Sequence, residues 1–288
     1  MNDKNRQIAQ QLLIGAYDLH THSAPSVFQR SLDSMELMKE ADAAGMGGIM
    51  LKSHYEPTAL RAELINKYSG CRAKAYGGLV LNWPQGGLNI YAVEEAMRAG
   101  AKIVWMPTRD SENSLCFGNM EGDFFTRPGI TVLHRKKTAL KEIVYDIMDA
   151  VKAHNGFLAT GHLSPEESLL LCREGRSRNV KMILTHPEFP RTRVSVEMQK
   201  EISETGVLIE KCWFNIAQGA VSVEQMAERI HQIGAKNCFL TTDRGQKNFP
   251  SPVREMESFI SALIGVGVTE EEIKDMTRRV PSEILSIS

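Results

Sequence analysis

The stretch Tyr17-Asp18-Leu19-His20-Thr21-His22 ends a short apolar run with two histidines. Four later apolar runs also end in polar side chains that can bind a metal or a substrate: Met50-Leu51-Lys52-Ser53-His54, Ala159-Thr160-Gly161-His162, Ile183-Leu184-Thr185-His186 and Leu240-Thr241-Thr242-Asp243. One histidine after a strand says little. An ordered series of such residues, each at the carboxyl end of a predicted strand, indicates a metal site at the mouth of a parallel barrel.

The whole chain alternates between predicted strands and helices. Apolar runs predict eight strands, at residues 15–20, 48–52, 73–81, 102–106, 156–161, 181–185, 206–210 and 237–241. Helix starts are predicted at Asp33, Ser164, Ser222 and Thr269, because a Glu or Gln follows each of them three residues later. Such alternation favours parallel strands joined by helical crossovers.

These units predict an α/β fold, the (β/α)8 TIM barrel, as one domain over residues 1–288, a length that suits this fold. An open, doubly wound sheet is the alternative. No G-x-G-x-x-G motif follows the first strand, which weakens a dinucleotide-binding interpretation.

Composition narrows the classes of partner. The formal net charge of −1 suggests no polyelectrolyte partner, so we expect a small-molecule substrate and no nucleic acid. No apolar run reaches 18 residues, so we expect no membrane span. The start lacks a secretory signal, and the five cysteines are scattered without a C-x-x-C pair, which predicts reduced thiols in a cytoplasmic protein. A homo-oligomer stays open.

The one long irregular stretch, residues 109–137, follows the fourth predicted strand and is rich in Gly, Asn, Ser and Asp. Loops of this length in a compact domain are usually functional or disordered. On the catalytic face of a barrel it could act as a lid. An insertion without a role is the alternative.

The paired histidines carry the strongest chemical signal. Residues i and i+2 of a strand point to the same face, so His20 and His22 aim at one point, as a zinc ion with bonds of about 2.0–2.1 Å requires. Asp18 shares that face and could accept a hydrogen bond from a ligand imidazole. His162, His186 and Asp243 are the first ionisable residues after their own strands. Asp243 could serve both as a ligand and as the general base for a metal-activated water.

Together these residues resemble the amidohydrolase superfamily of metal-dependent hydrolases, whose pattern is H-x-H on strand 1, a His after strands 5 and 6, and an Asp after strand 8. His20, His22, His162, His186 and Asp243 match it in order, over nearly the whole chain. The resemblance implies hydrolysis of an amide, lactone, ester or phosphoester by one or two divalent metals, most often zinc. The substrate is not implied.

One family feature is displaced. Two-metal members often carry a carboxylated lysine on strand 4, whereas the better placed lysine here is Lys52, after strand 2. A carbamate on Lys52 could bridge two metals; the alternative is an ammonium that binds substrate. Lys211 is a weaker candidate. His54, two residues beyond Lys52, is expected to contact substrate or metal, or to have a structural role in the turn.

Arginines at the starts of loops suggest an anionic substrate, because guanidinium groups bind carboxylate or phosphate in a bidentate manner. The candidates are Arg109, Arg191 and Arg244, with Arg193 beside the second. Solubilising surface arginine is the alternative for each. Two other functions also stay open: a metal-dependent decarboxylase or phosphoesterase on the same barrel, and a barrel without catalysis that binds metal or senses a ligand.

Overall fold

The computed structural model describes residues 3–118, 127–134 and 139–287. Its eight strands form one sheet in the order β1 to β8, and each neighbouring pair from β1–β2 to β6–β7 is parallel. They are β1 (Tyr17–Thr21), β2 (Gly48–Leu51), β3 (Lys74–Val80), β4 (Ile103–Trp105), β5 (Phe157–Ala159), β6 (Lys181–Leu184), β7 (Leu208–Cys212) and β8 (Cys238–Thr241). The predicted fold class, a (β/α)8 barrel, is therefore confirmed.

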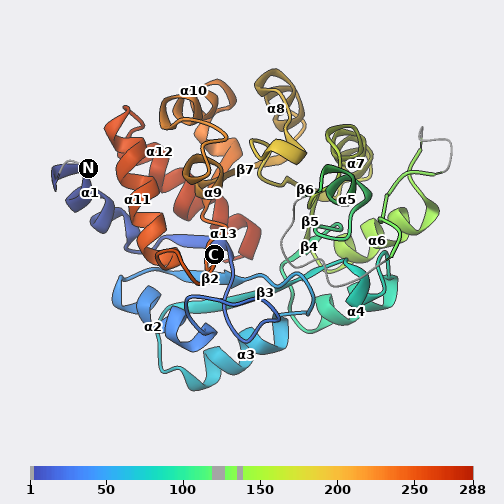
Figure 1. The fold of residues 1–288 in the computed structure, drawn as a ribbon, viewed down its shortest axis with the longest axis horizontal. Coiled ribbons are helices and arrows are strands. Elements are labelled where there is room, and N and C mark those ends of the chain that lie inside the picture. Colours follow the sequence, from blue (N-terminus) through green and yellow to red (C-terminus); the bar gives the residue numbers. More distant parts are fainter. Residues whose placement is uncertain (1–2, 119–126, 135–138, 288) are drawn as a thin grey trace. The chain divides into compact units, whose positions relative to one another are not determined.

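Helices follow the strands along the chain (Figure 1). They are α1 (Asp3–Leu13), α2 (Ser34–Ala43), α3 (Ala59–Tyr68), α4 (Ile90–Arg98), α5 (Glu112–Phe117), α6 (Glu142–Ala153), α7 (Pro165–Ser177), α8 (Val196–Ser203), α9 (Trp213–Ala217), α10 (Val223–Ile233), α11 (Pro252–Gly265), α12 (Glu270–Lys274) and α13 (Val280–Leu285). The four predicted helix starts are confirmed, since Asp33, Ser164, Ser222 and Thr269 all form capping boxes.

The chain separates into two compact units. Unit 1 comprises Met1–Lys52, Leu60–Gly77 and Glu210–Ser288, and unit 2 comprises Ser53–Ala59 and Gly78–Ile209. The expectation of a single domain over the whole chain stays a prediction. In the described part of the chain, no helix has the length and apolar character needed to cross a membrane.

Unit 1 brings the two ends of the barrel sequence together. The N-terminal helix α1 packs along α11, as Figure 1 shows. Strands β1 and β8 are neighbours, and the parallel bridge between Thr21 and Arg244 extends their contact beyond the strand ends. Leu19 of β1 and Leu240 of β8 are 1% and 0% exposed, so this contact lies in the core.

Unit 2 contains β4, β5 and β6 with their helices, including the packed pairs α4–α6 and α7–α8. The predicted irregular loop at 109–137 is wrong in part, because residues Glu112–Phe117 form α5, capped by Ser111. Ser111 also forms a bridge with Ile130. Residues 119–126 and 135–137 of the predicted lid lie outside the described residues.

Candidate metal centre

The backbone of unit 1 delivers three predicted ligands to one place. The amide of Asp243 donates to the carbonyl of His20 at 2.8 Å, and the amide of His22 donates to the carbonyl of Arg244 at 2.7 Å. These two bonds continue the β1–β8 contact past the strand ends. They set the aspartate beside the paired histidines, although more than 200 residues separate them in the sequence.

The ligand atoms converge. Asp243 Oδ1 lies 3.1 Å from His20 Nε2 and 3.0 Å from His22 Nε2. One ligand atom from each of the three residues falls within 4.8 Å of the others. Neighbouring ligands of a tetrahedral zinc ion stand about 3.4 Å apart, given bonds of about 2.0–2.1 Å. The observed spacing is therefore close to what a metal site needs.

The outer nitrogens of both rings are held by groups that only accept hydrogen bonds. His20 Nδ1 lies 2.7 Å from Glu210 Oε1, and His22 Nδ1 lies 2.9 Å from the carbonyl oxygen of Lys52. Each Nδ1 therefore carries a proton, and Nε2 is the ring nitrogen that faces Asp243 and would bind a metal in its deprotonated form. Partners of this kind are typical behind metal-binding histidines.

Burial and charge set the ionisation of this cluster. Burial, helped by the positive charge of Arg30, lowers the pKa of His22 to about 3, so this ring is neutral. Burial also opposes the charging of His20, but the carboxylates of Asp243 and Glu210 outweigh it and raise the pKa of His20 to about 9. Against its own burial, the nearby His20 holds the pKa of Asp243 well below the usual value. Asp243 is thus a carboxylate.

Lys52 joins the same cluster. Its side chain is 4% exposed, and Nζ lies 2.9 Å from His20 Nε2. Burial lowers the pKa of the Lys52 amine, which favours the neutral form. A neutral amine is the form that can react with carbon dioxide.

Glu210 was not among the predicted site residues. The seventh strand was predicted to end at residue 210, but β7 continues to Cys212. Its carboxylate is 2% exposed, contacts His20 and accepts a hydrogen bond from Thr241 Oγ1 at 2.9 Å. Alternation within the longer strand was the one signal that could have shown Glu210 to face the site.

The role predicted for Asp18 is wrong. Its Oδ1 accepts from the backbone amides of His20 and Thr242, both at 3.2 Å, and its Oδ2 accepts from Thr242 Oγ1 at 2.5 Å. It therefore ties β1 to the residues after β8 and does not hold a ligand imidazole. Burial raises the pKa of Asp18 to about 7.

Unit 2 gathers three other histidines of the predicted series. The ring centroids of His162 and His186 lie 5.0 Å apart, and those of His54 and His162 lie 6.2 Å apart. His54 Nδ1 is 2.9 Å from Thr108 Oγ1. His186 has a φ of +26°, a region that few residues other than glycine adopt. Such strain is found most often at functional sites.

The arginines differ in their surroundings. Arg191 donates to the carbonyls of Ser114 and Gly118 at 3.3 and 3.5 Å and lies over the Phe117 ring, so it fastens α5. Arg109 is 8% exposed. Arg244, 2% exposed, has its Nε 3.5 Å from Glu255 Oε1.

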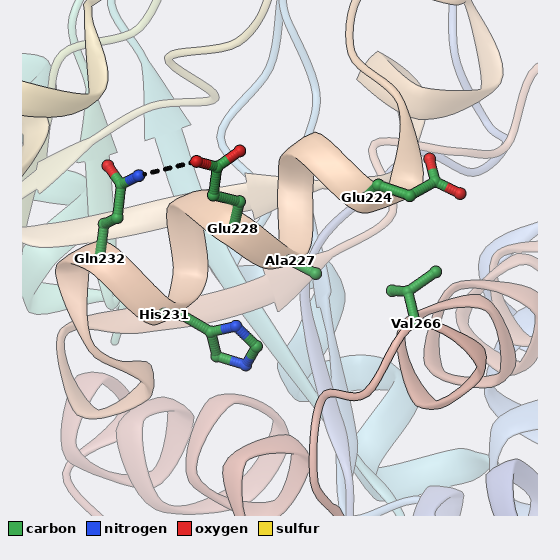
Figure 2. Close-up of a pocket in the computed structure, with 6 residues that line it drawn as sticks. All are labelled: Glu224, Ala227, Glu228, His231, Gln232 and Val266. Atoms are coloured by element: carbon green, nitrogen blue, oxygen red, sulfur yellow. Dashed lines mark hydrogen bonds between the residues drawn. The ribbon is translucent and has the colours of Figure 1, made fainter.

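A surface groove lies apart from these residues in the sequence. Figure 2 shows its lining, which comes from α10 and from Val266 after α11. Gln232 donates to Glu228 along one wall at 3.1 Å. None of the predicted site residues lines this groove.

Comparison with known proteins supports the fold. A family model described as "Family of unknown function (DUF6282)" matches residues 15–210, more than half of the chain. A search of curated proteins finds no match.

Several solved structures share the architecture. A probable dipeptidase, PvdM, from Pseudomonas aeruginosa is 10% identical, with 99% of this chain and 100% of that chain covered and a TM-score of 0.67. An amidohydrolase from the same organism is 13% identical, with 98% of each chain covered and a TM-score of 0.63. A 2,6-dihydroxybenzoate decarboxylase from Rhizobium is 13% identical, with 95% and 99% covered and a TM-score of 0.55. The predicted resemblance to the amidohydrolase superfamily is thus confirmed at the level of the fold.

Proposed function

This chain belongs to DUF6282, a family of unknown function. For this chain we propose a metal-dependent hydrolase that uses an activated water. The observation that carries the proposal is the convergence of three possible ligand atoms in unit 1. His20 Nε2 and His22 Nε2 both face Asp243 Oδ1, at 3.1 and 3.0 Å. Two imidazoles and one carboxylate at this spacing fit a divalent metal, which would take the place of the His20 proton.

We propose zinc as that metal, held by His20, His22 and Asp243. The ligand roles of His162 and His186, which belong to unit 2, stay predictions from the sequence. A bound zinc ion supplies Lewis acidity, which lowers the pKa of water toward about 7 and polarises the bond to be broken. Asp243 stays ionised, so its carboxylate can accept the proton of the attacking water and return it to the leaving group. Glu210 fixes the tautomer of His20 throughout.

The chemical state of Lys52, carbamate or free amine, distinguishes a two-metal site from a one-metal site. In the two-metal form we propose, its neutral amine combines with carbon dioxide, one proton is released, and the carbamate oxygens provide additional ligands. The burial of Lys52 and its contact with His20 support this form. In the one-metal form the amine would contact the substrate.

For the substrate we propose a small anionic molecule with an amide, lactone, ester or phosphoester bond. Of the candidate contacts, His54, Arg109 and Arg191 lie in unit 2 and Arg244 lies in unit 1. The contacts of Arg191 with α5 already give it a structural role, which leaves Arg244 the stronger candidate.

A direct test loads the purified chain with zinc and assays a panel of N-acyl amino acids, lactones, aryl esters and phosphoesters. We expect turnover of at least one class, its loss on chelation, and a fall of at least a hundredfold in Asp243→Asn. Asp149→Asn, an exposed carboxylate paired with Arg178 on the surface, is the control and should keep full activity. Release of carbon dioxide from aromatic acids without hydrolysis would favour the decarboxylase. Zinc binding without turnover of any substrate class would favour the barrel without catalysis, which binds metal or senses a ligand.

A further inference from the structure

Two of the most buried polar side chains in unit 1 present atoms without a hydrogen-bond partner among the described residues. Asn215 is 1% exposed, and neither Nδ2 nor Oδ1 of its amide has a partner. Arg244 is 2% exposed, and neither its Nε nor its Nη1 has a hydrogen-bond partner. Buried polar groups are nearly always paired, so each unpaired one calls for an explanation such as an absent ligand.

The two residues follow neighbouring positions in the strand order, β7 and β8. Asn215 belongs to α9, directly after β7, and Arg244 follows β8 by three residues. The amide of Phe214 donates to the carbonyl of Thr242 at 3.1 Å, which joins α9 to the segment after β8. The Arg244 guanidinium carbon lies 5.5 Å from the centre of the Phe214 ring, beside Asn215 in the sequence. Arg244 also directly follows Asp243, a proposed metal ligand.

The guanidinium of Arg244 is held on one side. Its Nε faces Glu255 at 3.5 Å, and Glu255 in turn accepts a hydrogen bond from Trp213 Nε1. The Phe249 ring lies 4.6 Å from the guanidinium carbon. Glu255 thus forms an ion pair on the Nε side without a hydrogen bond, and Nη1 keeps a donor for another acceptor. An arginine held in this way is suited to bind a planar anion.

The chemistry of the unpaired atoms defines the ligand. Arg244 Nη1 and Asn215 Nδ2 are donors, a pair that suits the two oxygens of a carboxylate. Asn215 Oδ1 is an acceptor, which requires an N–H or O–H group on the same ligand. We propose that Arg244 and Asn215 form the subsite for a substrate carboxylate that has an N–H or O–H donor close to it, as in an N-acyl amino acid. Hydrolysis of such a ligand rests on the proposed function, whereas binding of its carboxylate by Arg244 and Asn215 does not.

Binding can be measured without turnover, by calorimetry on the full chain with zinc and again after chelation. The probe is N-acetylglycine. Two matched probes each change one feature: N-acetylglycinamide has no charge, and levulinate replaces the N–H by CH2. We expect N-acetylglycine to bind at least tenfold more tightly than the amide and several-fold more tightly than levulinate. Neither residue is a proposed metal ligand, so this order should survive chelation even if no hydrolysis is ever found.

Variants assign the contacts. Asn215→Leu and Arg244→Gln should each weaken binding of N-acetylglycine at least tenfold. Asn215→Leu should leave the Tm unchanged or raise it, because leucine fills a similar volume without an unpaired amide. Arg254→Gln, an exposed arginine on α11, is the charge control and should bind as the unchanged protein does. Unchanged binding in Asn215→Leu, or equal affinity for the acid and its amide, would overturn the subsite.

Discussion

His22 Nε2 lies 3.0 Å from Asp243 Oδ1, although both atoms are acceptors in the ionisation states that the site imposes. The pKa of His22 is lowered by burial, and its single ring proton points to the carbonyl of Lys52. A shared proton or a metal ion between these two atoms would satisfy both of them. The close approach therefore supports the proposed metal site.

Asp243→Asn should separate the stability of the metal-free protein from its binding of zinc. The amide nitrogen of the new side chain can donate to His22 Nε2, so we expect the chelated variant to have a Tm at or above that of the chelated unchanged protein. Asparagine also tolerates the φ of +51° at this position. The stabilisation by zinc, about 4 kcal/mol at a thousandfold excess over Kd, should disappear. Thermal unfolding with and without zinc checks both; a variant still stabilised by zinc contradicts the ligand assignment.

Glu210→Gln should weaken metal binding without removing a ligand. The amide can present its NH2 to His20 Nδ1, which favours the other tautomer and puts the ring proton where the metal binds. Loss of such a supporting carboxylate typically costs about 10–100-fold in affinity. Competition with a zinc chelator measures this loss. Glu201→Gln, an exposed carboxylate on α8, is the control, and an equal effect in both variants would rule out a specific role.

Lys52→Ala should lower the number of metals bound. If the carbamate bridges two ions, the content should fall from two equivalents to one or none. Reconstitution of the unchanged protein in carbon dioxide-free buffer should give the same low content, restored by bicarbonate. Metal analysis of each sample decides the matter: one equivalent in all of them means that Lys52 is an amine.

The affinity for zinc should depend on pH through His20. The carboxylates of Asp243 and Glu210 overcome burial and raise its pKa from 6.5 to about 9. Between these values the metal-free folded chain holds a proton that the unfolded chain has lost. The stabilising contribution of this proton is full below about pH 6.5 and is lost as the pH rises through about 9.

Zinc must displace that proton, so its affinity should rise by up to tenfold per pH unit below about pH 9. Calorimetry in buffers of different ionisation enthalpy counts the released proton. Titration in which zinc binding releases no proton at pH 7.5 would show that His20 is already neutral.

Gly245→Ala should disrupt the ligand backbone itself. A Cβ at this residue would stand 1.7 Å from the carbonyl oxygen of His22, and the φ is +127°. We expect a loss of about 3 kcal/mol in unfolding free energy, together with loss of zinc binding. Gly267→Ala has a similar positive φ but nothing within 4 Å, so it should cost about 1 kcal/mol. Denaturant unfolding compares the two; equal losses would mean that the close approach to His22 is unimportant.

Local sequence patterns predicted the strands, helix starts and side-chain directions that interactions between neighbouring residues determine. Apolar runs and capping residues located the eight strands and four helix starts, and the same-face rule for His20 and His22 holds in the buried cluster. The partner of the His20 ring could not be chosen in this way. Asp18 lies two residues away on the same face, whereas Glu210 is 190 residues distant, and only the packing of β7 in unit 1 selects it.

The unpaired amide of Asn215 was equally invisible, because α9 is a five-residue helix without a strong sequence signal. The interrupted loop shows the same limit. Helix α5 has six residues, and its contact with Arg191, 77 residues from Ser114, is a tertiary one.

The hydrogen bonds between the ends of β1 and β8 also have a consequence for biosynthesis. The carboxylate partner of His20 and His22 follows them by more than 200 residues. The three-residue site therefore does not exist on a nascent chain until those intervening residues and β8 have been made. Fragments that end before β8 lack this site, so zinc held by His20, His22 and Asp243 marks a chain whose first and last strands have already met.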